Sequence, residues 1–253
     1  MKTVSVRNVE IGSGIPKICV PIIGISKEDI FDEVKRLDGI PVDIVEWRID
    51  YFENAFDHVK VEEILKKLRG ALGDTPILMT FRTSREGGEK SIEPDDYVTI
   101  NIKAAETGYI DIVDVEAFAG DDVVKEIITG AHNAGIKVIA SNHDFDKTPD
   151  KNDIISRLCK MQSLGADISK IAVMPTNKYD VLTLLTATEE MYRDYADRPI
   201  VTVSMGKLGA ISRLCGEAFG SAITFGAVEK ASAPGQLEAR DLSSILTLLH
   251  NEL

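Results

Sequence analysis

Eight short runs rich in Val and Ile recur along the chain and alternate with longer segments of helical periodicity. Runs of this kind, bounded by Gly, Pro or Asp, are typical of buried parallel strands. Each run and the segment after it take about 22 to 34 residues, the length that a strand–helix–strand crossover needs. The eight runs are residues 17–24, 42–49, 76–82, 109–116, 136–143, 168–175, 199–206 and 221–226.

The segments between the runs show the spacing of amphipathic helices. In residues 26–38, Ile30, Val34 and Leu37 fall on one helical face. Residues 122–135 end in a glycine, which commonly terminates a helix. Further helices are expected at residues 153–166, 177–195 and about 239–250.

Eight such units without a linker or a break in composition predict one domain, residues 1–253, folded as a single (β/α)8 TIM barrel. The alternative is a doubly wound open sheet, which usually has fewer strands and often a glycine-rich phosphate-binding turn. Neither GxGxxG nor GxxxxGK[ST] occurs in the sequence, so the barrel is favoured. The first sixteen residues are expected to form a short β-hairpin that closes the N-terminal end, or bottom, of the barrel.

Charge and cysteine content narrow the function classes. The chain has 41 acidic and 29 basic residues, a formal net charge of −12, which disfavours binding to nucleic acid or to an anionic membrane. It shows neither a secretory h-region nor a long apolar run, so a cytoplasmic location is expected. The three cysteines are widely spaced, and this argues against a disulfide framework or a cysteine zinc site.

Polar side chains follow the second to the sixth runs, where the strands of a barrel carry the active site at their carboxyl ends. Because side chains alternate along a strand between the barrel interior and the helices, these residues are expected to point into the same mouth of the barrel. Taken singly, each has an ordinary structural explanation as a rim charge or a core histidine. Together they favour a functional site, because unpaired charges inside a barrel are costly. These residues are Glu46, Arg48, Thr80, Arg82, Asp114, Glu116, Ser141, His143 and Lys170.

Lys170 lies inside an apolar run, where an ammonium group is poorly hydrated. One interpretation is an ion pair with Glu46, Asp114 or Glu116. The other is a nucleophilic amine, since desolvation and nearby arginines would leave part of it neutral for attack on a ketone. The resulting imine would acidify the adjacent C–H bond, and His143 could accept that proton. Spacing alone leaves both interpretations open.

Two loops after the strands carry further candidates. Residues 80–92 form either a solvated loop or a cover over the mouth, in which Glu86 would orient His143. Residues 231–240 have the small, turn-forming residues of a lid.

Three side chains late in the chain suit an acidic, hydroxylated ligand. Arg213, on an expected helix after the seventh strand, is either a surface charge or a carboxylate ligand. Ser232 and Gln236 are either ordinary loop residues or hydrogen-bond donors to hydroxyl groups.

Six motifs spread in order over nearly the whole chain carry a family resemblance. They are EWRID (46–50), TFRTSREGG (80–88), SNHDF (141–145), KIAVMP (170–175), TVSMGKLGAISR (202–213) and SAPGQ (232–236). Together they resemble the type I 3-dehydroquinate dehydratase family, whose members are hydro-lyases of the shikimate pathway, which leads to chorismate and the aromatic amino acids.

The resemblance implies a mechanism and a role for each matched residue. Lys170 would form a Schiff base with the C3 ketone of 3-dehydroquinate. His143 would take a C2 proton and later deliver one to the leaving C1 hydroxyl, a syn elimination that gives 3-dehydroshikimate. Glu86 would position His143. The resemblance implies no cofactor and no metal.

The resemblance also implies how the substrate is held. Arg213 would pair with the substrate carboxylate, and Asp50 and Asp114 would have supporting roles only. A homodimer is expected. The remaining substrate contacts would come from Glu46, Arg48, Arg82, Ser232 and Gln236.

Two other functions remain as alternatives. A class I aldolase or transaldolase would use the same lysine chemistry to cleave a C–C bond, commonly in a sugar phosphate. A catalytically silent barrel would bind a carboxylate metabolite or act as an assembly partner. The set of Lys170, His143 and Glu86 favours dehydration over both.

Overall fold

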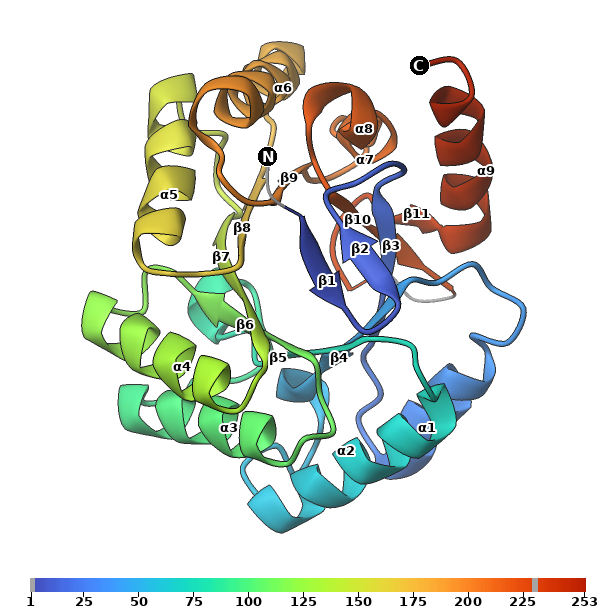
Figure 1. Cartoon of the computed structure of the whole chain (residues 1–253), viewed down its shortest axis with the longest axis vertical. Coiled ribbons are helices and arrows are strands. Elements are labelled where there is room, and N and C mark those ends of the chain that lie inside the picture. Colours follow the sequence, from blue (N-terminus) through green and yellow to red (C-terminus); the bar gives the residue numbers. More distant parts are fainter. Residues whose placement is uncertain (1–2, 229–231) are drawn as a thin grey trace.

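In the computed structural model, which describes residues 3–228 and 232–253, eight parallel strands form a ring with helices on its outside (Figure 1). The order around the ring is the order along the chain. The ring closes between its last two strands, where Ala222 N donates to Ile200 O at 2.8 Å. The strands are β3 (Lys17–Ile22), β4 (Ile44–Arg48), β5 (Ile77–Thr80), β6 (Ile112–Glu116), β7 (Lys137–Asp144), β8 (Ile168–Val173), β9 (Ile200–Ser204) and β10 (Ile223–Ala227). All eight predicted strands and the predicted barrel are confirmed.

Helices fill the crossovers, and their ends follow local sequence. Ser26 and Asp29 form a capping box at the start of α1, and Asn177 and Asp180 do the same for α6. The predicted helix 177–195 is α-helical only to Glu190 and continues as a π-helical turn, Met191–Tyr195. The α-helices are α1 (Lys27–Lys35), α2 (His58–Leu72), α3 (Pro94–Glu106), α4 (Asp121–Asn133), α5 (Lys151–Ser163), α6 (Lys178–Glu190), α7 (Ile211–Leu214), α8 (Gly216–Phe219) and α9 (Ala239–His250).

Alternating strand positions divide the core into two layers. On β4, Val45 and Trp47 pack under the helices, whereas Ile44 points into the barrel. Each fully buried side chain of this size contributes roughly 1.5 to 3 kcal/mol through removal from water. The period-2 pattern therefore sends the alternate residues, Glu46 and Arg48, to the barrel interior.

The predicted N-terminal hairpin is confirmed. Strands β1 (Val4–Val6) and β2 (Val9–Ile11) pair antiparallel and lie across the near end of the ring in Figure 1. Their apolar side chains pack on the inward residues at the amino ends of the strands, such as Ile44 and Leu78. The hairpin thus closes the bottom of the barrel and leaves the carboxyl ends of the strands as the open mouth.

An ion-pair cluster fastens the hairpin turn to the ring. Arg7 Nε lies 2.5 Å from Asp111 Oδ1, and Arg69 binds the other oxygen of the same carboxylate. Asp111 also accepts from Ile77 N at 2.8 Å. This cluster lies at the amino ends of the strands, away from the mouth.

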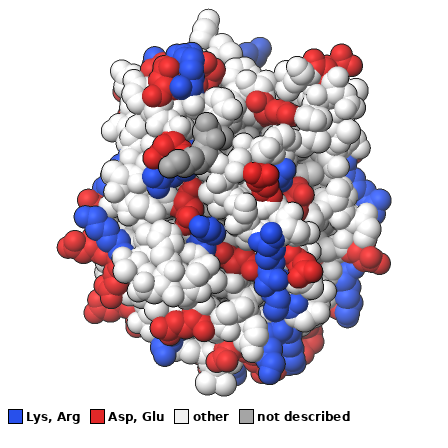
Figure 2. Space-filling view, viewed as in Figure 1, with Lys and Arg blue, Asp and Glu red and all other residues white. Residues whose placement is uncertain are grey.

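Acidic and basic side chains are interspersed over the face that carries the hairpin (Figure 2). Within residues 3–228 and 232–253, none of the helices combines the length and the apolar character that crossing a bilayer requires.

Candidate active site

The nine residues to which the family resemblance assigns catalysis or substrate binding all line one pocket at the carboxyl ends of the strands. The space among these side chains, including the part open to solvent, is about 520 Å³. Gly87, Phe145, Met205 and Phe225 complete much of the apolar wall. The nine residues are Glu46, Arg48, Arg82, Glu86, His143, Lys170, Arg213, Ser232 and Gln236.

Lys170 is buried at the floor of this pocket, with only 4% of its surface exposed. Its Nζ lies 3.3 Å from Asp114 Oδ2 and 4.4 Å from the centroid of the Phe225 ring. Of the three carboxylates considered as partners from the sequence, Asp114 makes the ion pair. The contact is longer than a usual charge-assisted hydrogen bond, so the amine is oriented by Asp114 without being enclosed by it.

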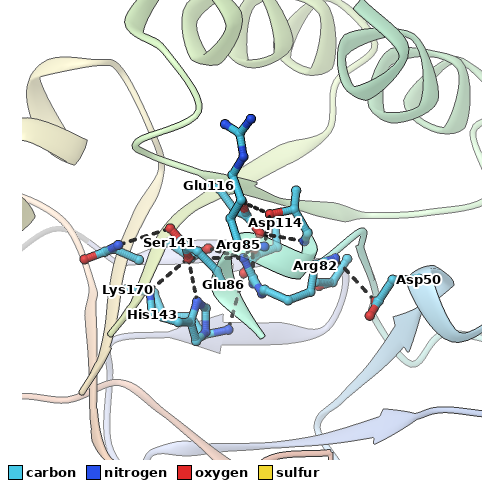
Figure 3. Close-up of polar contacts among 12 residues, drawn as sticks. Asp50, Arg82, Arg85, Glu86, Asp114, Glu116, Ser141, His143 and Lys170 are labelled. Carbon is cyan, nitrogen blue, oxygen red and sulfur yellow. Dashed lines mark hydrogen bonds and ion pairs between the residues drawn. The ribbon is translucent and has the colours of Figure 1, made fainter. Parts of the chain in front are cut away.

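Asp114 belongs to a buried network beneath the pocket (Figure 3). Its Oδ1 accepts from Arg82 Nη2 and from Ser141 Oγ, each at 2.6 Å. Burial alone would raise the pKa of Asp114, but Arg82 and Lys170 outweigh it and hold that pKa below its ordinary value. Asp114 therefore carries a fixed negative charge directly beside the lysine amine.

Arg82 reaches the pocket with its guanidinium already bonded to protein groups. Besides Asp114, its Nη1 contacts Glu116 Oε1 at 3.1 Å and Ser141 Oγ at 3.0 Å. Burial opposes its charge, but the surrounding carboxylates raise its pKa well above the ordinary value. Arg82 is thus a permanent cation that fixes this network, and any substrate contact would share its bonded nitrogens.

His143 is held against Glu86, which ends the short 3-10 turn Ser84–Glu86. His143 Nδ1 lies 3.0 Å from Glu86 Oε2, and the backbone N–H of His143 donates to the same oxygen at 2.8 Å. Because the ionised carboxylate only accepts, this contact assigns the proton to Nδ1 and a free lone pair to Nε2. Gly87, at φ 83°, lets the chain turn at this point, and a Cβ there would lie 2.5 Å from the Phe145 ring.

Burial shifts the pKa values of His143 and Glu86 in opposite directions. It lowers the pKa of His143 well below the ordinary value, and the cations Arg82, Lys170 and Arg48 lower it further. Burial raises the pKa of Glu86 to about 7, although Arg82 opposes this. The imidazole is therefore neutral near neutral pH and able to accept a proton.

Arg213 presents a buried cation to the pocket with few partners. Its Nη1 and Nη2 contact the carbonyl oxygens of Phe225, at 3.4 Å, and Pro234, at 3.1 Å. Its Nε is buried and has no hydrogen-bond partner in the part of the chain that the structure describes. Burial lowers its pKa to about 10, so it stays charged at neutral pH. A buried guanidinium with an unsatisfied N–H suits a ligand carboxylate.

On β4, Glu46 and Arg48 are both held by neighbouring side chains. Glu46 Oε1 accepts from Thr80 Oγ1 at 2.8 Å. Arg48 makes a two-point contact with Asp50, with both distances at 2.8 Å. The buried Asp50 also accepts from the backbone N–H of Arg82, at 3.3 Å, and so links this strand to the loop that follows β5.

Residues 232–236, after β10, contribute to the lining of the pocket. Strand β11 (Leu237–Glu238) pairs with β10, and Pro234 O accepts from Gly206 N at 3.0 Å. Ser232 and Gln236 bond to each other, with Gln236 Nε2 donating to Ser232 Oγ at 3.0 Å. Ala231, the first residue of the lid segment expected from the sequence, lies outside the described residues.

Sequence reasoning misses Asn142, which contacts the candidate site from the other side of its strand. Its Nδ2 donates to Glu86 Oε1 at 3.1 Å. Strand parity points Asn142 toward the helices, away from His143, so period-2 reasoning excludes it from the mouth. Only its position next to His143 signals a role.

Comparison with known proteins gives consistent matches over the full chain. The family described as "Type I 3-dehydroquinase" matches residues 18–252. The 3-dehydroquinate dehydratase of Clostridioides difficile (strain 630) is 55% identical over 252 residues, covering 100% of this chain and 99% of the relative. That of Salmonella agona (strain SL483) is 52% identical over 250 residues, with 99% of each covered.

Solved structures agree. A type I 3-dehydroquinate dehydratase from Clostridium difficile with covalently modified comenic acid has a TM-score of 0.97 at 55% identity, covering 100% of this chain and 99% of that one. The 3-dehydroquinate dehydratase from Enterococcus faecalis has a TM-score of 0.91 at 44% identity, covering 97% and 98%. A 3-hexulose-6-phosphate synthase, at 17% identity and a TM-score of 0.62, shares the fold alone.

Proposed function

The chain belongs to the type I 3-dehydroquinase family and is a 3-dehydroquinate dehydratase, a hydro-lyase, and we propose that it eliminates water from 3-dehydroquinate through an imine on Lys170. One observation carries the proposal. A buried lysine amine shares its pocket with a neutral histidine and with a buried arginine that lacks a carboxylate partner among the described residues.

Substrate binding follows from the charges around the pocket. Arg213 pairs with the substrate carboxylate, which satisfies its unbonded N–H and compensates its buried charge. The remaining polar residues bind hydroxyl groups and the carboxylate: Glu46, Arg48, Arg82, Ser232 and Gln236.

The first chemical step is imine formation. Lys170 attacks the C3 carbonyl as the free amine, after its ammonium group has given up a proton. That proton goes to the hydroxyl of the carbinolamine, which leaves as water, so that a protonated imine remains. The ionised Asp114, 3.3 Å from Nζ, supplies the counter-charge to the iminium. The iminium then draws electrons from C2 and makes its C–H bond acidic.

The second step is elimination through His143. Its Nε2 takes the C2 proton to give an enamine, and the imidazolium formed is stabilised by Glu86 at 3.0 Å. The same imidazolium protonates the C1 hydroxyl, which leaves as water while the C2=C3 electrons of the enamine form the C1=C2 double bond and the nitrogen lone pair restores the iminium. One group serves both transfers, so proton and hydroxyl leave from the same face. Hydrolysis of the imine releases 3-dehydroshikimate and restores Lys170.

Borohydride trapping tests this proposal. Protein treated with 3-dehydroquinate and borohydride is digested, and the peptide carrying Lys170 is weighed by mass spectrometry, with Lys170→Ala as the control. A ligand-sized addition on that peptide, absent from the control, supports the imine. Turnover without any adduct would mean an elimination that needs no imine. If both the adduct and turnover were absent, an aldolase or a binding protein would be favoured.

We further propose a cellular location, an oligomeric state and a pathway for this enzyme. Residues 1–253 act as one catalytic domain in the cytoplasm, as a homodimer without a cofactor, in the shikimate pathway toward chorismate and the aromatic amino acids. The named activity of the relatives supports the place in the pathway. Light scattering on the purified protein tests the dimer. A mass of 27.7 kDa, that of one chain, would show a monomer, whereas twice that mass is expected.

A further inference from the structure

A chain of hydrogen bonds runs outward from Glu86 to the helix α5. Asn142 Nδ2 donates to Glu86 Oε1 at 3.1 Å, and Asn142 Oδ1 accepts from Arg157 Nη1 at 2.9 Å. Asn142 is buried, with 8% of its surface exposed, so water competes little for these contacts. The general base proposed above is thus connected to a residue on the outer layer of the barrel.

The chemistry of Arg157 decides which way the Asn142 amide faces. A guanidinium has donors only, so the oxygen of the amide must face Arg157. The NH2 group is then left for Glu86. Rotated by half a turn, the amide would put its oxygen against a carboxylate oxygen and its NH2 against the guanidinium, and both contacts would be lost.

Arg157 is itself held in place. Its Nε and Nη2 contact the two oxygens of Asp153, one helical turn earlier, at 3.1 and 2.8 Å. Its guanidinium lies 5.8 Å from the centroid of the Phe118 ring, and Asp144 is 3.7 Å away. These contacts with Asp153, Phe118 and Asp144 support the orientation in which the Arg157 guanidinium reaches Asn142.

The two oxygens of Glu86 are used differently. Oε1 receives Asn142, whereas Oε2 receives both the backbone N–H and Nδ1 of His143. The other charged groups that act on Glu86 are Arg82, 3.7 Å away, and Glu116. An N–H donor on Oε1 favours the ionised carboxylate, in which both oxygens only accept and each is left to receive an N–H group.

Building on the proposed elimination, we propose that Arg157 and Asn142 are positioning residues that keep Glu86 as the acceptor for His143 Nδ1–H. Without them the carboxylate turns or takes up a proton, and the imidazole is no longer fixed in the tautomer whose Nε2 accepts from C2. Neither residue lines the pocket that is proposed to take the substrate. Their effect therefore falls on the elimination step and spares both imine formation and substrate binding.

Steady-state kinetics with 3-dehydroquinate test this on Arg157→Met, Asn142→Ala and the double variant. Lys160→Met is the matched control, since Lys160 lies on the same helix and over the same Phe118 ring, 4.9 Å from its centroid, but pairs with Asp121. We expect kcat to fall about tenfold in each single variant while KM stays within about twofold. Lys160→Met should keep the parent kcat.

The double variant separates a relay from two independent effects. If Arg157 acts through Asn142, the double variant loses no more than Asn142→Ala does. Losses of kcat that multiply, or a parent kcat in Arg157→Met, would overturn the proposal. Borohydride trapping on Lys170 must persist in every variant, and its loss would show general damage to the pocket and count against a positioning role.

Asn142→Asp provides a second readout. It preserves the size of the side chain and its contact with Arg157, but it replaces the donor that faces Glu86 with an acceptor. We expect kcat to fall further than in Asn142→Ala, whereas a purely structural role predicts the opposite order. Failure of the parent protein to dehydrate 3-dehydroquinate would contradict the proposed function itself, which the variants do not test.

Discussion

Lys170 and Asp114 lie two strands apart in the ring, on β8 and β6, yet Nζ and Oδ2 meet at 3.3 Å on the floor of the pocket. Asp114 is fully buried and held by Arg82 and Ser141, so its charge cannot turn away when the ligand changes. In the proposed mechanism this fixed negative charge stabilises the iminium on Lys170.

Asp114→Asn should slow imine chemistry because the iminium loses its counter-charge in a low-dielectric site. We expect kcat to fall roughly a hundredfold, with slower borohydride trapping on Lys170. Asp111→Asn is the matched control, since Asp111 precedes the same strand and pairs with Arg7 at the opposite end of the barrel. A kcat within about twofold of the parent in Asp114→Asn would show that the charge is not needed.

The eight strands and their inward faces could be predicted because both depend on period and composition. On β4, alternation alone separates Trp47, packed under helices, from Glu46 and Arg48, which face the pocket. That alternation repeats on every strand, so the polar inward positions meet at one mouth whatever the helices do.

Which groups pair with one another could not be predicted in the same way. The partner of Lys170 depends on the stagger of neighbouring strands and on the reach of each side chain. From the sequence, three carboxylates were equally good candidates for the ion pair with Lys170. Asn142 was missed because it faces the helices and reaches Glu86 only through a loop that folds back. The π-helical turn after Glu190 likewise depends on packing that local propensity does not encode.

His143→Ala should separate the two chemical steps. Lys170 keeps its amine and its contact with Asp114, so the imine still forms, but no imidazole remains to remove the C2 proton. Borohydride should trap the substrate on Lys170 with its C1 hydroxyl still in place, while turnover falls on the order of 10⁴-fold. His132→Ala is the control, because His132 lies on α4 and pairs with Asp167 at 2.8 Å. A folded His143→Ala variant that yields no adduct would assign imine formation to the histidine.

Arg213→Met should mainly weaken substrate binding. The variant loses the charge-assisted contacts to the substrate carboxylate, worth about 3 kcal/mol, which corresponds to roughly a hundredfold rise in KM. Arg193→Met is the control, since Arg193 is exposed on the outer surface and pairs with Glu189. An unchanged KM in Arg213→Met would remove the carboxylate role from this residue.

The Glu86–His143 pair should determine the acid limb of the pH profile. Because burial raises the pKa of Glu86 to about 7, the pair takes up its first proton near that pH, and the ring then lacks an ionised acceptor. We expect kcat/KM to fall as the pH drops through about 7. In Glu86→Gln this transition disappears, and activity, lower throughout, should fall only at a more acidic pH, because burial holds the pKa of His143 well below its ordinary value.

The pKa shifts of Glu86 and His143 also determine whether the stability of the fold rises or falls with pH. Between the ordinary pKa of Glu86, 4.5, and about 7, the folded state binds more protons at this carboxyl than the unfolded state, so its contribution to stability falls as the pH rises. His143 acts in the opposite sense below 6.5, because its folded pKa is lowered. The free energy of unfolding of Glu86→Gln, measured with urea, should therefore rise relative to that of the parent as the pH increases from 5 to 8. A difference that is constant over this range would show that Glu86 keeps its ordinary pKa in the folded protein.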